Sequence, residues 1–333
     1  MIKMKTILAA VLLCISATLH AQQMYLHITM SNGQVNDFCE GEIEEMTMDN
    51  TDEPPYELKA DPMATFFHLK LTNGNDMEYN MKRVKDITFN TTPPMLNGHE
   101  YVDIGGIKWA TMNVGATTVA KSKDTAFGNY YAWGETEPKT YYDEDNYTYT
   151  SNDSKLSNDH DVAYQEWGEG WMMPSSVDFQ SLVNACWGEG NVEDEKDDRL
   201  IKLMTVTESM KDNITNGDYG IYKVEAGSII DGETYGVAGI LFVRDAFHKL
   251  FFPAAGVMLG DVNVNDELEG TDYVEYWCND IYAGDKECAY NFSCDYEYIR
   301  FQERNKASSV YVGGWSTDFR FIGFTVRPIV KYY

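Results

Sequence analysis

The sequence predicts an α+β protein built mainly from antiparallel strands, and three observations support this prediction. Apolar and polar residues alternate along many short segments, which is the pattern of strands with one buried face. Asn-Gly pairs separate such segments near the N-terminus, and this pair is typical of tight hairpin turns. Helical spacing of apolar residues is clear in just two segments, both in the middle of the chain.

The first 21 residues predict a signal peptide. Lys3 and Lys5 precede an apolar run at 7–15, and small and polar residues follow as far as Ala21. The run is too short to cross a bilayer, and no later stretch approaches the roughly 20 apolar residues that a membrane helix needs. We therefore expect an exported protein without a transmembrane segment, located in the periplasm, on the cell surface or outside the cell.

Two copies of one segment follow the signal peptide. Residues 24–48 match residues 65–89 without a gap, so that His27 corresponds to His68 and Asn32-Gly33 corresponds to Asn73-Gly74. In each copy the Asn-Gly pair lies between two alternating runs, and a third short run comes later. Each copy therefore predicts a hairpin followed by a third strand.

These copies define two β-repeats, which we place at residues 22–50 and 63–92. A lone hairpin is marginal in water, so we expect the two repeats to form a small β-sheet together or to pack on their neighbour. The proline-containing segment at 50–62 is a polar connector between them, and the sequence at 90–94 ends the second repeat.

A larger domain is expected from residue 96 to residue 333. One predicted helix covers 161–168, and a second follows Pro174, where Ser175 and Asp178 form a capping box. A third helix is an option within 191–213. The predicted strands are short and lie at 100–115, 129–135, 220–226, 239–245, 249–256, 309–315 and 323–330.

Charge and motifs exclude several function classes. The chain has 53 acidic and 26 basic residues, a formal net charge of −27, so it repels nucleic acid and anionic lipid. It lacks the GxSxG, HExxH, CxxC, GxGxxG and phosphate-loop signatures. A pair of carboxylates remains an open route to an enzyme, because so many acidic residues always supply a plausible pair.

Five cysteines follow the signal peptide: Cys39, Cys186, Cys278, Cys288 and Cys294. Export favours disulfides, and if one bridge forms, it should join two of the last three. Three cysteines without a nearby histidine fall short of a structural zinc site. No metal or cofactor is therefore expected from the residues themselves.

Five blocks of the larger domain lie at 101–116, 127–139, 167–187, 250–256 and 323–329. In this order they resemble the Fibrobacter succinogenes major paralogous domain, a family common in exported proteins of gut Bacteroidetes. The resemblance covers roughly residues 98–333, and the doubled hairpin is similar to the short β-repeat often found before such domains. The family has no established activity, so the resemblance implies no reaction.

A more distant resemblance concerns the fold. Residues 172–182 and 273–282, with the ending of the chain, are similar to blocks of formylglycine-generating enzymes, whose superfamily has the C-type lectin fold. A C-type lectin-like domain is therefore implied for 96–333. The active cysteines of those enzymes follow a Gly-Gly block near the C-terminus. This chain has no cysteine after Cys294, so we do not expect their oxidative chemistry.

The lectin-like resemblance also implies a ligand face. C-type lectins hold calcium with a Trp-Asn-Asp motif, and Trp277-Cys278-Asn279-Asp280 has this order with one residue inserted, so calcium is a conceivable ligand. The insertion moves Asn279 to the other side of a strand. Late loops of such domains bind ligands, and aromatic side chains supply rigid contact area there. The expected ligand-binding residues are Trp277, Asn279, Asp280, Tyr282, Tyr290, Tyr296, Tyr298 and Trp315.

These observations favour an exported, non-enzymatic binding or display module that recognises a glycan or a protein ligand through late loops. One alternative is a carbohydrate-active or protein-modifying enzyme that uses carboxylates. Another is a receptor diversified by a retroelement, because such proteins use the lectin fold with a variable surface rich in Tyr, Asn, Ser and Asp.

Overall fold

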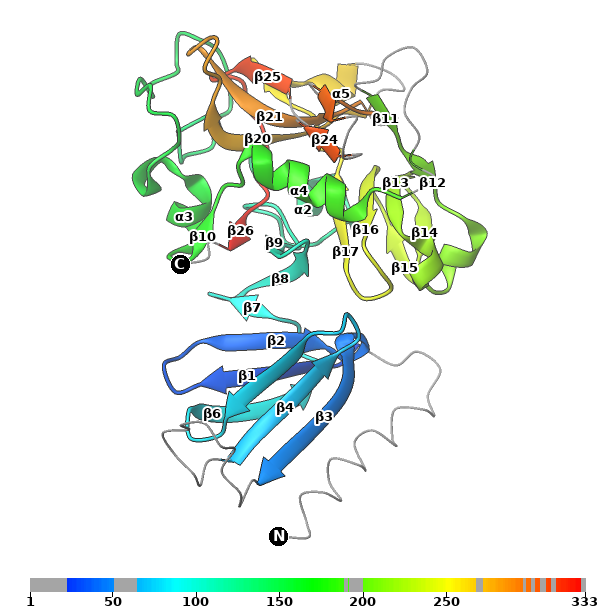
Figure 1. Cartoon of the computed structure of the whole chain (residues 1–333). Helices are drawn as coiled ribbons and strands as arrows, with labels where there is room; N and C mark the ends of the chain where they lie inside the picture. Colours follow the sequence, from blue (N-terminus) through cyan, green and yellow to red (C-terminus); the bar gives the residue numbers. More distant parts are fainter. Residues whose placement is uncertain are drawn as a thin grey trace. The chain divides into compact units, whose positions relative to one another are not determined.

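A computed structural model of the chain describes residues 23–50, 65–188, 191, 200–267, 272–295, 298–300, 303–305, 310–312 and 316–330 (Figure 1). The chain divides into two compact units, residues 1–94 and 95–333, and each is described here by itself. Antiparallel strands dominate, which confirms the predicted α+β class. No helix among the described residues has the length and apolar character needed to cross a membrane.

The first unit contains the six strands that the repeats predict. In each repeat an Asn-Gly turn connects a hairpin, and Gly33 and Gly74 have φ angles of 92° and 86°. These values are accessible to glycine without strain, which explains the turn sequence. The strands are β1 (Tyr25–Met30), β2 (Val35–Cys39) and β3 (Ile43–Asn50) of the first repeat, with β4 (Thr65–Leu71), β5 (Asp76–Asn80) and β6 (Val84–Asn90) of the second.

The third strands of the two repeats are exchanged. The six strands form two three-stranded sheets rather than a single one, with the orders β2-β1-β6 and β3-β4-β5. Each hairpin is therefore completed by the third strand of the other repeat. The registers are equivalent: Ile28 of β1 pairs with Ile87, and Leu69 of β4 pairs with Met46.

The core of this unit has the same pseudo-symmetry. Leu26 and Ile28 of the first repeat correspond to Phe67 and Leu69 of the second, and all four side chains are buried. The two sheets thus bury equivalent positions against each other. Apolar residues alternate along β1 and β4, so each sheet has one apolar face. In this cluster the apolar face of each sheet packs on that of the other.

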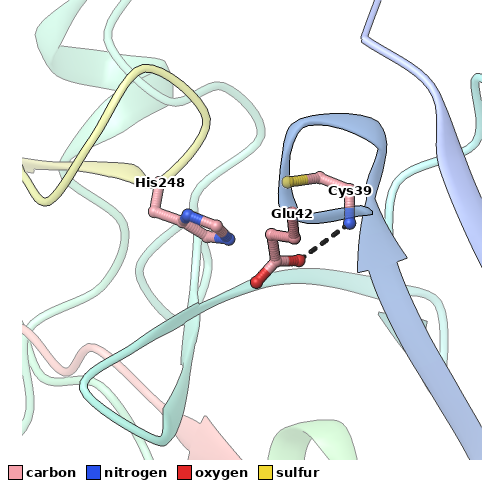
Figure 2. A group of neighbouring side chains, drawn as sticks. All are labelled: Cys39, Glu42 and His248. Carbon is pink, nitrogen blue, oxygen red and sulfur yellow. Dashed lines mark hydrogen bonds between the residues drawn. The ribbon is translucent and has the colours of Figure 1, made fainter. Parts of the chain in front are cut away.

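A short 3-10 helix, η1 (Glu40–Glu42), connects β2 to β3. Figure 2 shows that the backbone N–H of Cys39 donates to Glu42 Oε2 at 2.9 Å. The Glu42 carboxylate thereby satisfies a donor at the start of the helix that would otherwise lack an intrahelical acceptor. The same figure labels His248, which belongs to the second unit. Within that unit, His248 Nδ1 lies 2.8 Å from Asp245 Oδ1.

The second unit contains three larger sheets. The first has the order β10-β26-β9-β8-β7, the second β11-β22-β21-β20 with β25 also paired to β21, and the third β12-β13-β16-β17. The first is formed by β7 (Met95–Leu96), β8 (His99–Ile104), β9 (Ile107–Ala110), β10 (Trp171–Met172) and β26 (Ile329–Val330). The second is formed by β11 (Leu200–Lys202), β20 (Val274–Ile281), β21 (Cys288–Cys294), β22 (Tyr298–Arg300) and β25 (Ser316–Phe319). The third is formed by β12 (Met204–Thr205), β13 (Gly220–Val224), β16 (Gly239–Val243) and β17 (Lys249–Pro253).

Short hairpins and helices complete this unit. The two-stranded sheets are β14 (Ser228–Ile230) with β15 (Glu233–Tyr235), β18 (Met258–Leu259) with β19 (Val262–Asn263), and β23 (Glu303–Asn305) with β24 (Val310–Val312). The α-helices are α2 (Lys123–Ala126), α3 (Val162–Trp167), α4 (Ser176–Cys186) and α5 (Val264–Glu267). The 3-10 helices are η2 (Asn158–His160), η3 (Glu208–Lys211) and η4 (Asn216–Asp218).

Helix α4 begins as the sequence predicts. The Ser175 side chain accepts from the backbone of Asp178, and the Asp178 side chain accepts from the backbone of Ser175. The apolar face of α4 enters the largest core cluster, where the rings of Phe179 and Phe292 stack with centroids 4.8 Å apart. This contact fixes α4 against β21.

Some predicted elements were wrong. Residues 129–135 form no strand; Tyr131 makes only an isolated bridge to Phe324, and Gly134 has a φ of 80°. Of the strand predicted at 323–330, only β26 (Ile329–Val330) forms. Within 191–213 the described residues form β11, β12 and η3 instead of an α-helix. The remaining residues of that range, 192–199, lie outside the described part.

The five cysteines of the described residues are thiols, so no disulfide joins Cys278, Cys288 or Cys294 there. Cys278 and Cys294 are buried within the same core cluster as Cys186. They act as small apolar side chains between α4 and the sheet of β20 and β21.

Candidate functional site

Trp277 lies in the core and cannot be part of a ligand face. Its side chain is fully buried in β20, its Nε1–H donates to the Tyr131 carbonyl at 2.8 Å, and its ring lies 4.1 Å from that of Phe324. The expected surface role of Trp277 was therefore wrong. Both faces of β20 are covered here: Tyr276 and Cys278 enter one core cluster, and Trp277 enters another, where a buried acceptor satisfies the indole N–H.

Asn279 is also buried, which corrects its assignment to a ligand surface. Its Nδ2 donates to the Met173 carbonyl at 2.9 Å, and its backbone N–H donates to the Pro174 carbonyl at 2.9 Å. These two bonds attach the segment before α4 to β20. The pairing of β20 with β21 has a bulge between Trp277 and Ile281.

Asp280 stabilises the N-terminus of α4. Its Oδ2 accepts from the backbone N–H of Ser176 at 3.1 Å and from the Ser176 hydroxyl. Burial raises the pKa of the Asp280 carboxyl, and the bonds from Ser176 oppose that rise. An acidic group at this place is favourable because the first N–H groups of a helix lack intrahelical acceptors.

Tyr282 and Tyr290 do lie together at the surface. Both are partly exposed, and their rings form an edge-to-face pair with centroids 5.4 Å apart. Phe319 of β25 lies next to them, because Cys288 pairs with Phe319 and accepts at its carbonyl from the Tyr282 N–H at 3.0 Å. The Phe319 side chain is 47% exposed. We call Tyr282, Tyr290 and Phe319 the aromatic patch.

Tyr298, another of the expected aromatic residues, does not join this patch. Tyr298 lies in β22 and pairs with Lys202, beside the opposite end of β21. Cys294, the residue of β21 that pairs with β22, is four positions along the strand from Tyr290, which is about 13 Å of chain. Tyr296 and Trp315 lie outside the described residues.

A concave site lies in the loops between β9 and α3. It is a cavity of 540 Å³, within the usual range for small-molecule pockets. Glu135, Lys139, Thr148 and Ser151 contribute polar side chains to its lining, with Tyr149 and His160 as ring walls. We call it the polar pocket.

Glu135 organises one side of the polar pocket. Its Oε1 accepts from the backbone N–H of Thr148 at 2.8 Å and from the Thr148 hydroxyl at 2.7 Å, while Oε2 forms an ion pair with Lys139. Lys139 also donates to the Asn146 carbonyl at 2.8 Å. Both carboxylate oxygens are thus engaged by the protein, and Glu135 holds two loops together.

The opposite wall consists of two rings. His160 Nδ1 lies 3.0 Å from the Gly134 carbonyl, and its ring centroid lies 4.4 Å from that of Tyr149. A carbonyl only accepts, so Nδ1 carries the hydrogen, and Nε2 of the neutral ring is left as an acceptor. No hydrogen bond among the described residues uses Nε2, which leaves it available to a bound hydroxyl.

Gly134 is required for this geometry. Its φ is +80°, and a Cβ there would lie 2.3 Å from Tyr149 Cδ1. The absence of a side chain lets the Tyr149 ring pack directly on the backbone, between the pocket and the buried ring of Trp133, 5.6 Å away.

Arg320 connects the polar pocket to the aromatic patch. Its Nη1 donates to the Ser151 carbonyl at 2.7 Å, and its backbone N–H donates to the Glu287 carbonyl at 3.0 Å. The guanidinium lies 5.5 Å from the Tyr147 ring centroid and 5.6 Å from that of Trp133. This buried cation therefore fixes the loop of the pocket against the turn between β20 and β21.

The same loop continues along β20. The Leu156 N–H donates to the Asn279 carbonyl at 3.1 Å, and the Ile281 N–H donates to the Ser154 carbonyl at 3.2 Å. In Figure 1 the green loop before α3 accordingly lies beside the β20–β21 hairpin. The pocket and the patch are thus at one end of the second unit.

The sequence did not reveal the polar pocket, because its residues come from three separate loop segments. The block at 127–139 contains Gly134, Glu135 and Lys139, but nothing in its pattern shows that residues 148–151 and 159–160 complete a cavity with it. Phe319 was missed because the pairing of β25 with β21 leaves no local signal.

Comparison of the chain with protein-family models, with curated proteins and with solved structures finds no match.

Proposed function

We propose that this protein is an exported recognition module without catalytic activity, and that the polar pocket takes a neutral sugar residue of a glycan. The observation that carries the proposal is the lining of the pocket. Donors and acceptors surround a cavity of ligand size, and two rings form one wall. A sugar presents hydroxyls that both donate and accept, together with an apolar ring face that packs on aromatic side chains.

Other ligand classes fit this lining less well. The pocket carries the carboxylates of Glu135, Glu137 and Asp159 against the ammonium of Lys139, so it repels phosphate, nucleic acid and other anions. Its polar side chains would be left without partners against a lipid tail. A neutral polyhydroxylated ligand meets neither penalty.

Binding is favoured over hydrolysis by the state of the acidic groups. Both oxygens of Glu135 are engaged by Thr148 and Lys139. Glu137 and Asp159 are exposed at the rim of the pocket. We therefore assign Glu137 and Asp159 as acceptors for sugar hydroxyls, since neither makes a hydrogen bond or ion pair within the described residues.

The aromatic patch extends the proposed site. Tyr282 and Phe319 present partly exposed rings at the same end of the unit, beyond Arg320. In this proposal the patch contacts further sugars of a chain whose terminal residue lies in the polar pocket.

The test is a glycan array with the chain from residue 22 onward, followed by calorimetry on the best ligand. Asp159→Asn should weaken binding about tenfold through the loss of a charged acceptor. Glu144→Gln is the matched control, because Glu144 is exposed but does not line the pocket. Release of shorter sugars from the ligand would refute the non-catalytic assignment, and absence of any glycan binding would refute the ligand class.

A further inference from the structure

A second cavity in the same unit has a different chemistry. It measures 640 Å³ and is lined by residues of β8, β15, β16 and β17 and by the loop around Val119. Tyr235, Leu241 and Phe251 supply apolar walls. The charged residues of the lining are Glu100, Lys121, Glu233 and Lys249. We call it the amphipathic pocket. None of its lining residues belongs to the polar pocket.

Glu100 introduces a charge into this cavity without compensation from the protein. The carboxylate makes no hydrogen bond or ion pair with any described residue, and burial raises the pKa of the Glu100 carboxyl. A desolvated carboxylate is costly unless a donor or cation meets it. The arrangement therefore lacks one partner that a ligand can supply.

Two other charged residues also line the cavity, Lys121 and Glu233; both are exposed and their charges are opposite. Lys249 does not provide the partner of Glu100, because its ammonium forms an ion pair with Asp231. Asp231 is fixed in the tight turn between β14 and β15, where its φ is 55° and Gly232 follows with a φ of 76°. Burial alone lowers the pKa of Lys249 to about 8, and the Asp231 carboxylate opposes this change by favouring the ammonium. The unbalanced charge that remains in the cavity is that of Glu100.

An aromatic pair lines the same cavity. The rings of Tyr235 and Phe251 meet edge to face with centroids 4.7 Å apart. Ring faces attract cations as well as apolar groups. The Tyr235 hydroxyl makes no hydrogen bond within the described residues although it belongs to a buried side chain, so it is also available to a ligand.

We propose that the amphipathic pocket binds a small organic cation: a primary ammonium group meets Glu100, and its hydrocarbon body packs on Tyr235 and Phe251. The pocket can hold such a hydrocarbon group, because its volume of 640 Å³ lies within the usual range for small-molecule sites. The large negative charge of the chain, −27, raises the local concentration of cations near it. This site is independent of the proposed glycan site.

The test compares three compounds of the same shape by calorimetry with the purified protein at neutral pH: benzylamine, benzyl alcohol and benzoate. Benzylamine should bind, while the neutral and anionic compounds should bind at least about tenfold more weakly, the loss of one charge-assisted contact. Equal binding of benzyl alcohol would overturn the proposal, as would preferential binding of benzoate or no binding of benzylamine.

Two variants locate the site. Glu100→Gln keeps the shape of the side chain and should weaken benzylamine binding about tenfold to hundredfold. Glu225→Gln removes the same charge from an exposed position outside the cavity and should leave binding unchanged. Unchanged binding in Glu100→Gln would overturn the assignment of Glu100, and the comparison of the three compounds does not depend on the stability of any variant.

Discussion

Replacement of Gly134 by alanine should destabilise the second unit through two separable effects. The first is the backbone, because φ is +80° at this position and a non-glycine residue in the left-handed region costs about 1–2 kcal/mol. The second is a steric conflict. The new Cβ would lie 2.3 Å from Tyr149 Cδ1 and 2.6 Å from Cε1, whereas carbon atoms prefer separations of about 3.5–4.0 Å.

The ring of Tyr149 must therefore move by about 1 Å or more, away from the position in which it contacts Trp133 and His160. Overpacking of this kind costs about 1–3 kcal/mol, so the total loss in the free energy of unfolding should be about 2–5 kcal/mol. Glycan binding in the polar pocket should weaken as well, because Tyr149 forms one of its walls.

Gly227→Ala is the matched control. Gly227 has a φ of +87°, and a Cβ there would meet nothing within 4 Å, so this variant carries the backbone cost alone. Urea denaturation of both variants and of the parent protein gives the difference, which should be about 1–3 kcal/mol. Equal losses of stability in the two variants, with unchanged glycan binding, would refute the packing described for Tyr149.

Three further predictions concern the cores and the titrating groups. Ile28→Ala and Leu69→Ala should each lower the free energy of unfolding, measured by urea denaturation, by about 2–5 kcal/mol. The two losses should be similar, because the side chains occupy equivalent buried positions in the exchanged sheets. A loss in one variant alone would contradict the pseudo-symmetry. Glu100→Gln should be more stable than the parent protein at pH 7.5, and this difference in stability should vanish toward pH 4. The reason is that a carboxyl whose pKa is raised in the folded state destabilises the fold only above its unfolded pKa. Urea denaturation at the two pH values measures the sign of the difference. Cys288 should react first with a thiol reagent, and slowly, because it is the one partly exposed cysteine of the described residues and burial raises the pKa of its thiol; Cys278 should react only in denaturant.

The local elements of the fold were predictable from the sequence because their signals are local. The Asn-Gly turns specify two hairpins through the φ angles that they permit, and the pair Ser175 and Asp178 marks the start of α4. The exchange of third strands was not predictable, because β3 and β6 have the same alternation of apolar residues. Judged by sequence, each of these strands could pair with either hairpin. The packing of the core determines which pairing forms.

The functional site was predictable only in part for a related reason. Tyr282 and Tyr290 are near in sequence and do pair at the surface, as the late-loop argument expected. Trp277 belongs to the same segment but is buried, because both faces of β20 are covered: Tyr276 and Cys278 enter one core cluster and Trp277 enters another. The two pockets collect residues from distant loops, for which the sequence holds no contiguous pattern.

The exchanged strands of the first unit also limit how this protein can be divided. Removal of one repeat would take away the third strand of the other hairpin, so neither three-stranded sheet can form from a single repeat. A single cut in the connector between residues 51 and 64 would separate the chain without separating the fold, since each fragment remains hydrogen-bonded to the other along the full length of two strand pairs.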